Sequence, residues 1–279
     1  LGVNAGNSIA SGGNYNVVVG DEAGTALTTG DNNVAIGFEA LVTEDAHGNN
    51  TAVGYRSLKT LNAGADGFNT AVGYQSGTSM TTGLENTLIG VNAGDALTNA
   101  DFNVAIGTNA LSTDTLGSRT VAIGRETLFA QNFTTATDTY NVAVGYRAGA
   151  AVTIGLRNNL FGAFAGDSLT DADDTLGSKS VAIGRAVLAD QNFTTATDSF
   201  NTAVGYFAGN QVTTGTSNLL IGALAGDALT TASHNTAVGT AALTSDTLGS
   251  KSTAIGKNAL ATQNFTTATD SFNVAVGHE

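Results

Sequence analysis

The stretch Asn33-Val34-Ala35-Ile36-Gly37 (NVAIG) decides the fold, because close variants of it recur along all 279 residues. The pattern is Asn-x-Ala-aliphatic-Gly, and it returns as NTAVG at 50–54 and as NVAVG at 273–277. Its last residue, called here the closing glycine, occurs sixteen times. Nine of the fifteen spacings between closing glycines are 17 residues, three are 21, and the others are 18, 19 and 22. This internal repeat determines the architecture before any single element is considered.

Within the motif, apolar and small side chains alternate with the two-residue period of a β-strand. The residue before the closing glycine is apolar in all fifteen complete motifs, and the residue two positions earlier is Val, Thr or Leu in fourteen. We expect these two positions to face the interior. The other face then carries Asn, Ala and Gly, which a second surface can approach closely. The expected ladder on this face is represented by Asn33, Ala35, Gly37, Asn103, Ala105, Gly107, Asn201, Ala203 and Gly205.

A repeat of 17 residues is too short for a helix, a strand and their loops, and no 3.6-residue apolar period accompanies it. One repeat, called here a coil, can hold two short strands and two turns. The motif is one strand, and the other is expected near the Ala-Leu or Ala-Gly step that follows it. Stacked coils bury apolar residues that one coil cannot. The sequence therefore predicts an all-β fold, a parallel β-roll or β-solenoid of about sixteen short coils, forming a single repetitive segment over 1–279.

The fourth residue after each closing glycine is Gly or Leu, mostly in runs of two and two. Four coils therefore form a higher-order unit that has been duplicated. The interval from Gly162 to Gly184 breaks this order, and we interpret it as a place where one coil was lost by fusion.

The composition excludes several classes of function. The net charge of −13 and the pI near 4.3 argue against nucleic acid and against anionic membrane surfaces. The chain has no Cys, which excludes disulfides, thiolate catalysis and Cys-ligated metals. No apolar run approaches the ~20 residues that span a bilayer, so no membrane insertion is expected. Because the chain begins with Leu1, we expect it to be an excerpt of a longer or processed protein.

The thin coils leave a meagre core, and a lone roll would present open strand edges at its two ends. Side-by-side packing of several copies around an axis would complete such a structure. We therefore expect a closed cyclic oligomer, with the Asn/Ala/Gly ladder near the shared axis and the aliphatic ladder inside each roll.

Several strings carry a family resemblance. SVAIG (180–184) and STAIG (252–256) resemble the head repeats of trimeric autotransporter adhesins, the YadA-like heads. NTAVGYRSL (50–58), NTAVGYQSG (69–77) and NVAVGYRAG (141–149) resemble the repeats of phage tail-fibre-type proteins and of large bacterial surface proteins. The resemblance covers essentially the whole chain. It implies a left-handed roll, a homotrimer, and an extracellular location in a virion tail fibre or on a bacterial cell surface.

Residues with catalytic or metal-binding chemistry are few. An acidic cluster in the fused coil could hold Ca²⁺ through Asp171, Asp173 and Asp174, but the nonapeptide pattern of calcium-binding rolls is absent. No Walker loop, nucleophile elbow or zinc signature is present, so we predict neither an enzyme nor a cofactor. The histidines lie in unrelated repeat contexts and are interpreted as solvated residues: His47, His234 and His278.

The string QNFTTATD departs most from the scaffold, and it occurs at 131–138, 191–198 and 263–270, within 21-residue spacings. Insertions in repeat proteins map to loops on one face, often the binding face. Two interpretations stay open: the Phe takes part in recognition at an exposed loop tip, or it folds back to cover the edge of the roll. Asn-Phe-Thr also matches the glycosylation acceptor pattern. The candidate recognition residues are Phe133, Phe193, Phe265, Asn132, Asn192 and Asn264.

Several functions compete. The first is an extracellular attachment fibre, a tail-fibre segment or adhesin head that presents a surface to a cell-surface glycan or envelope protein. The second is a purely structural filament or surface-layer component without a receptor. A polysaccharide-degrading spike is disfavoured by the absence of Trp and of any paired-carboxylate signature. An ice-binding Thr array is disfavoured because Thr is not regularly spaced on one face.

Overall fold

The computed structural model describes residues 2–169, 179–195 and 197–278. Every regular element in these ranges is a β-strand, and none is a helix. The chain comprises two compact units, Leu1–Tyr140 and Asn141–Glu279. Each unit is a stack of coils whose strands run parallel, which confirms the predicted all-β, parallel β-solenoid fold.

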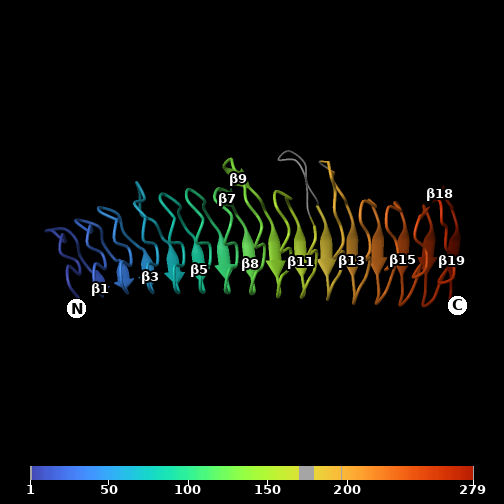
Figure 1. The fold of residues 1–279 in the computed structure, drawn as a ribbon, viewed down its shortest axis with the longest axis horizontal. Helices are drawn as coiled ribbons and strands as arrows, with labels where there is room; N and C mark the ends of the chain where they lie inside the picture. Colours follow the sequence, from blue (N-terminus) through green and yellow to red (C-terminus); the bar gives the residue numbers. More distant parts are fainter. Residues whose placement is uncertain (1, 170–178, 196, 279) are drawn as a thin grey trace. The chain divides into compact units, whose positions relative to one another are not determined.

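Each described copy of the motif forms a three-residue strand that lies beside the equivalent strands of its unit (Figure 1). The pairing keeps equivalent residues in register, so that Ala35 pairs with Ala52 and Ala182 with Ala203. The strands of the first unit are β1 (Val17–Val19), β2 (Val34–Ile36), β3 (Thr51–Val53), β4 (Thr70–Val72), β5 (Thr87–Ile89), β6 (Val104–Ile106) and β8 (Val121–Ile123). Those of the second unit are β10 (Val142–Val144), β11 (Asn159–Phe161), β12 (Val181–Ile183), β13 (Thr202–Val204), β14 (Leu219–Ile221), β15 (Thr236–Val238), β17 (Thr253–Ile255) and β19 (Val274–Val276).

Two further pairs of short parallel strands accompany the inserted loops. In the first unit β7 (Gly117–Ser118) pairs with β9 (Thr137–Asp138). In the second unit β16 (Gly249–Ser250) pairs with β18 (Thr269–Asp270).

The second strand that we expected at the Ala-Leu or Ala-Gly step does not occur in the described residues. That segment is a tight turn, because it contains residues with left-handed backbone angles, such as Glu39 (φ 52°) and Leu41 (φ 51°). A strand cannot continue through such angles. The coils nevertheless hydrogen-bond here, since the backbone N–H of Leu41 donates to the carbonyl oxygen of Ser57 at 3.0 Å.

The two faces of the strands are the reverse of our prediction. The alanines expected at the outer face are completely buried, whereas Ile36, expected inside, is 36% exposed. The reason is the narrowness of the coil, whose interior is already filled by single large side chains such as Leu41 and Leu58, both fully buried. The strand residue that faces such a side chain must be small. The ladder residues buried in this way include Asn33, Ala35, Asn103, Ala105, Asn201 and Ala203.

The buried asparagines form a hydrogen-bonded ladder along each stack. The side-chain oxygen of Asn86 accepts the backbone N–H of Asn103 at 2.9 Å, and the Asn103 side-chain nitrogen donates to the carbonyl oxygen of Gly117 at 2.9 Å. In the second unit Asn201 accepts the backbone N–H of Asn218 at 2.9 Å. Each Asn thus satisfies backbone groups that would be costly to bury without partners.

The alternation of Gly and Leu four residues after the closing glycine keeps the interior volume constant. In β5 the usual Ala is replaced by Leu88, which lies between Gly77 and Gly94. A Cβ atom added to either glycine would lie 2.8 Å from a Leu88 methyl carbon. In the second unit a Cβ atom added to Gly209 or Gly226 would lie 2.6 or 2.8 Å from a Leu220 methyl carbon. One added to Gly166 would lie 3.0 Å from a Leu160 methyl carbon. Apolar volume therefore shifts between strand and turn while the coil stays filled, as close packing requires.

The fused interval forms one coil of the stack, because β11 and β12 pair directly with each other. The Ca²⁺ candidates Asp171, Asp173 and Asp174 lie outside the described residues.

Candidate interaction surface

The outward face of each unit consists of the first and third residues of its three-residue strands. These side chains are exposed or half-buried in every described strand of this kind, and none of them is charged. Most are Val, Ile or Thr, as in Val104 and Ile106 of β6. Because the third position is apolar in every one of these strands and the first is mostly Val or Thr, each unit carries a continuous, largely apolar strip. The most exposed members within the stacks include Val17, Val19, Ile36, Ile89, Phe161, Ile183, Leu219, Ile221 and Ile255.

Aromatic or cationic side chains lie two residues before several of the strands, where the chain enters the strip. The Arg119 guanidinium carbon lies 4.7 Å from the ring centre of Phe102, and Arg119 forms an ion pair with Asp138. In the second unit the ammonium nitrogen of Lys251 lies 5.2 Å from the ring centre of Phe272. Single exposed contacts of this kind are weak. They bring a cation and an exposed ring together beside the strip in both units.

A second aromatic row borders the strip just after the closing glycines. The rings of Phe38, Tyr55 and Tyr74 stack with centroid separations of 5.4 and 5.0 Å. Arg56 lies over the Tyr55 ring at 4.9 Å and donates to a carboxylate oxygen of Glu39 at 2.7 Å. An uncharged apolar centre with aromatic and Arg side chains is the composition typical of protein–protein interfaces.

In the inserted loops the candidate recognition residues differ in exposure: the Phe side chains are mostly buried, whereas the Asn side chains are exposed. The loop that ends at β9 extends beyond the turns of its neighbours (Figure 1). Phe133 is nevertheless completely buried, Phe193 is 4% exposed, and Phe265 is half-buried. The structure therefore places Phe133 and Phe193 as the fold-back interpretation describes, rather than at exposed tips. The asparagines beside them are exposed: Asn132, Asn192 and Asn264.

A buried polar network anchors the first inserted loop. Asp114, which is completely buried, accepts the backbone N–H of Phe133 at 3.1 Å and the side-chain amide of Gln131 at 2.6 Å. Burial raises the pKa of the Asp114 carboxyl group above its ordinary value, and these hydrogen bonds offset only part of that rise. Gln131 also donates to the hydroxyl oxygen of Thr120 at 3.2 Å. The loop thus buries the Asp114 carboxylate and also supplies hydrogen-bond donors to it, so this part of the loop has a structural role.

The histidines lie in two kinds of environment. His234 and His278 are exposed, as predicted. His47 instead lies beside Glu44, with Nδ1 of His47 3.4 Å from Oε1 of Glu44. Glu44 is completely buried, and burial raises the pKa of its carboxyl group. Sequence reasoning missed Glu44, although an acidic residue at a position where other coils carry Leu was a usable signal.

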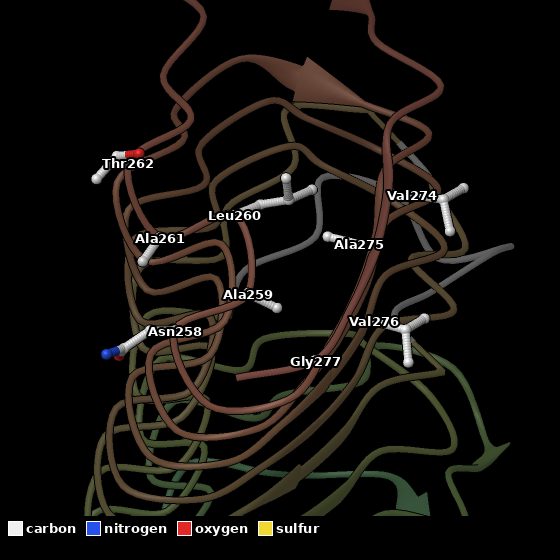
Figure 2. A pocket seen from close by; sticks show the side chains of 9 residues that line it. All are labelled: Asn258, Ala259, Leu260, Ala261, Thr262, Val274, Ala275, Val276 and Gly277. Atoms are coloured by element: carbon white, nitrogen blue, oxygen red, sulfur yellow. The ribbon is translucent and has the colours of Figure 1, made fainter. Parts of the chain in front are cut away.

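A recess of about 880 Å³ lies at the last described coil. Figure 2 shows the side chains that line it. The side chains of Leu260 and Ala275 point into it, while Val274 and Val276 point away. The recess is the interior of this coil. None of the residues that line it is titratable, and the polar side chains among them are those of Asn258 and Thr262. The lining residues are Asn258, Ala259, Leu260, Ala261, Thr262, Val274, Ala275, Val276 and Gly277.

Within the described part of the chain, no helix has the length and apolar character needed to cross a membrane. Comparison of the chain with protein-family models, with curated proteins and with solved structures finds no match.

Proposed function

We propose that this chain is a segment of an extracellular fibre whose copies associate as a homotrimer through their outward strips. The observation that carries the proposal is the apolar strip itself, which repeats in every described coil and is uncharged in a protein with a net charge of −13. Contiguous apolar surface on a soluble protein typically marks an interaction site. Charge elsewhere on the chain favours a soluble, self-repelling particle.

This proposal moves the shared axis to the opposite face from the one that the sequence suggested. The Asn/Ala/Gly ladder cannot lie between chains, because residues such as Asn103 and Ala105 are completely buried inside a coil. The Val and Ile side chains of the strip are the ones left for packing between copies. Copies of one chain have the same order of coils, so the strips of several copies can match coil for coil around a symmetry axis.

The role that we favour for the fibre is attachment, as a tail-fibre segment or adhesin head that carries or forms a surface for a cell-surface glycan or envelope protein. Support comes from the resemblance of the repeats and from the inserted loops that interrupt a uniform scaffold. A purely structural filament is the second candidate, and the burial of Phe133 favours it, since that ring is then part of the scaffold. A polysaccharide-degrading spike is the least favoured role.

Assembly is tested with two matched double variants in the same two coils. Ile89→Lys with Ile106→Lys places charges on the strip, whereas Thr82→Lys with Asn99→Lys places equal charges on exposed positions away from it. Light scattering on the parent chain should give three times the 27.8 kDa chain mass. The strip variant should dissociate and the control should not. A parent chain that is monomeric at all concentrations would contradict the proposal.

Attachment is tested separately by the binding of the purified trimer to bacterial cells and to isolated envelope polysaccharide. Saturable binding that a glycan competitor removes supports attachment. A trimer that binds none of a broad set of cells and glycans is instead a structural filament, and this result leaves the assembly proposal intact.

A further inference from the structure

Three coils carry a buried carboxylate seven residues after the closing glycine, and its backbone partners are equivalent in each. Glu44 accepts the backbone N–H of His47 at 3.3 Å and that of Ala63 at 3.1 Å. Asp114 accepts those of Gly117 and Phe133, both at 3.1 Å. Asp246 makes the same two contacts in the second unit. The three sites can therefore be compared donor by donor.

The third donor differs between the sites. The side-chain amide of Gln131 donates to Asp114 at 2.6 Å, and that of Gln263 donates to Asp246 at 2.6 Å. The residue at the equivalent distance from Glu44 is Leu61, whose side chain has no hydrogen-bond donor. The carboxylate of Glu44 is completely buried and lacks the side-chain amide that its two counterparts receive.

His47 takes the place that glycine has in the other two sites, and its ring lies beside Glu44. Nδ1 of His47 is 3.4 Å from Oε1 of Glu44, which exceeds the roughly 2.7–3.2 Å of a normal N–H···O bond. This nitrogen is buried and makes no hydrogen bond among the described residues. Two ligand atoms bound tetrahedrally at about 2.0–2.2 Å to one Zn²⁺ ion lie roughly 3.3–3.6 Å apart. The observed separation of 3.4 Å lies within this range.

We propose that Glu44, Asp45 and His47 form a binding site for Zn²⁺ or a similar divalent transition metal. One ligand atom from each residue lies within 4.8 Å of the others. One imidazole nitrogen with two carboxylates suits these metals, whereas Ca²⁺ and Mg²⁺ take oxygen ligands. The ion places a positive charge beside the buried carboxylate of Glu44. It also fixes the turn at 44–48 against the following coil, which contacts the same carboxylate through Ala63.

The test uses the full chain without a polyhistidine tag, stripped with EDTA and dialysed. Titration calorimetry with zinc chloride should show one site per chain, and zinc should raise the melting temperature. Cobalt chloride should give the strong visible absorption of tetrahedral Co²⁺. His47→Ala should weaken zinc binding about tenfold or more, since one ligand is lost. The matched control His234→Ala removes an exposed histidine outside the cluster and should bind zinc as the parent chain does.

Asp45→Asn keeps the test decisive if His47→Ala folds poorly, because Asp45 is only half-buried. This variant should lose zinc affinity while its melting temperature in EDTA stays that of the parent chain. The proposal is overturned if zinc neither binds nor stabilises the parent chain, or if both His47→Ala and Asp45→Asn bind it as the parent chain does. In either case His47 and Glu44 are in contact without a metal ion between them.

Discussion

A Cβ atom placed on Gly90 would lie 2.6 Å from the carbonyl oxygen of Gly107 in the next coil. The closing glycines stack so closely that each leaves no room for a side chain on the one before it. They also have backbone angles that other residues rarely adopt, such as φ 132° at Gly107. Close approach and backbone angle act together, which explains why glycine closes every motif.

Gly107→Ala should therefore destabilise the protein strongly. The added Cβ would lie 2.5 Å from the carbonyl oxygen of Gly124, and alanine would be strained at this φ. Strain and overpacking together should cost at least about 2 kcal/mol. Urea denaturation measures this loss. Gly64→Ala is the control, because nothing lies within 4 Å of a Cβ there. Equal midpoints for both variants would show that the stacked glycines are not sterically constrained.

Because apolar volume is exchanged between strand and turn, the loss of stability caused by a larger strand residue should be reduced by a smaller turn residue. Ala105→Leu should cost about 1–3 kcal/mol, because the interior already holds the buried side chain of Leu111 in the same coil. Adding Leu111→Gly recreates the surroundings of Leu88, which has glycines on both sides. The double variant should then be more stable than the sum of the two single changes indicates. Strict additivity in the same denaturation experiment would mean that the two positions do not share the space.

The sequence was sufficient to predict the stacking of coils but not the direction of their side chains. Period-two alternation identifies two faces of a strand such as β6 without saying which one is inside. We assigned the inside to Val104 and Ile106 because they are more apolar than Ala105. The structure reverses this because a coil closed by tight turns is too narrow for large residues from both walls. The replacement of Ala by Leu88 between two glycines was the signal in the sequence that could have settled the question.

The candidate sites were predicted unevenly for a related reason. The position of the inserted loops follows from counting residues, so their existence was predictable. The burial of Phe133 depends on Asp114 and Gln131, which meet only when the coils stack. Glu44 and His47 are three residues apart in the sequence. Their interpretation as metal ligands depends also on Leu61, one coil further on, where no side-chain amide is available to Glu44. In both sites the environment of the key side chain is set by contacts between successive coils, which a single coil's sequence does not reveal.

Replacing the partly buried Asp95 by a neutral residue should raise the stability of the protein in a pH-dependent way. Burial raises its pKa to about 6, and its Oδ1 atom makes no hydrogen bond among the described residues. The folded-state pKa exceeds the unfolded value of about 3.9. The stabilising contribution of the neutral carboxyl is therefore complete below about pH 4 and is lost as the pH rises through about 6.

Asp95→Asn should accordingly stabilise the protein at pH 7.5 but not at pH 4. The gain should be about 1–2 kcal/mol, less than the full shift implies, because the side chain is only partly buried. Thermal melts at both pH values measure it. Asp227→Asn is the matched control, since Asp227 occupies the equivalent position and accepts the Thr244 hydroxyl at 2.6 Å. A gain of equal size at both pH values would mean that ionisation of Asp95 is not its cause.

The inserted loops give the last prediction, which separates packing from recognition. Phe133→Ala should destabilise the protein by about 3–5 kcal/mol, because it empties a completely buried site. Asn132→Ala changes an exposed neighbour whose side chain accepts the Thr115 hydroxyl at 3.1 Å, and it should leave the melting temperature nearly unchanged. If the loop binds a glycan, Asn132→Ala should reduce that binding, since its side chain is accessible and the ring is not. A Phe133→Ala variant that melts like the parent chain but no longer binds cells would contradict the packing role, because a buried ring can affect binding only through the structure it supports.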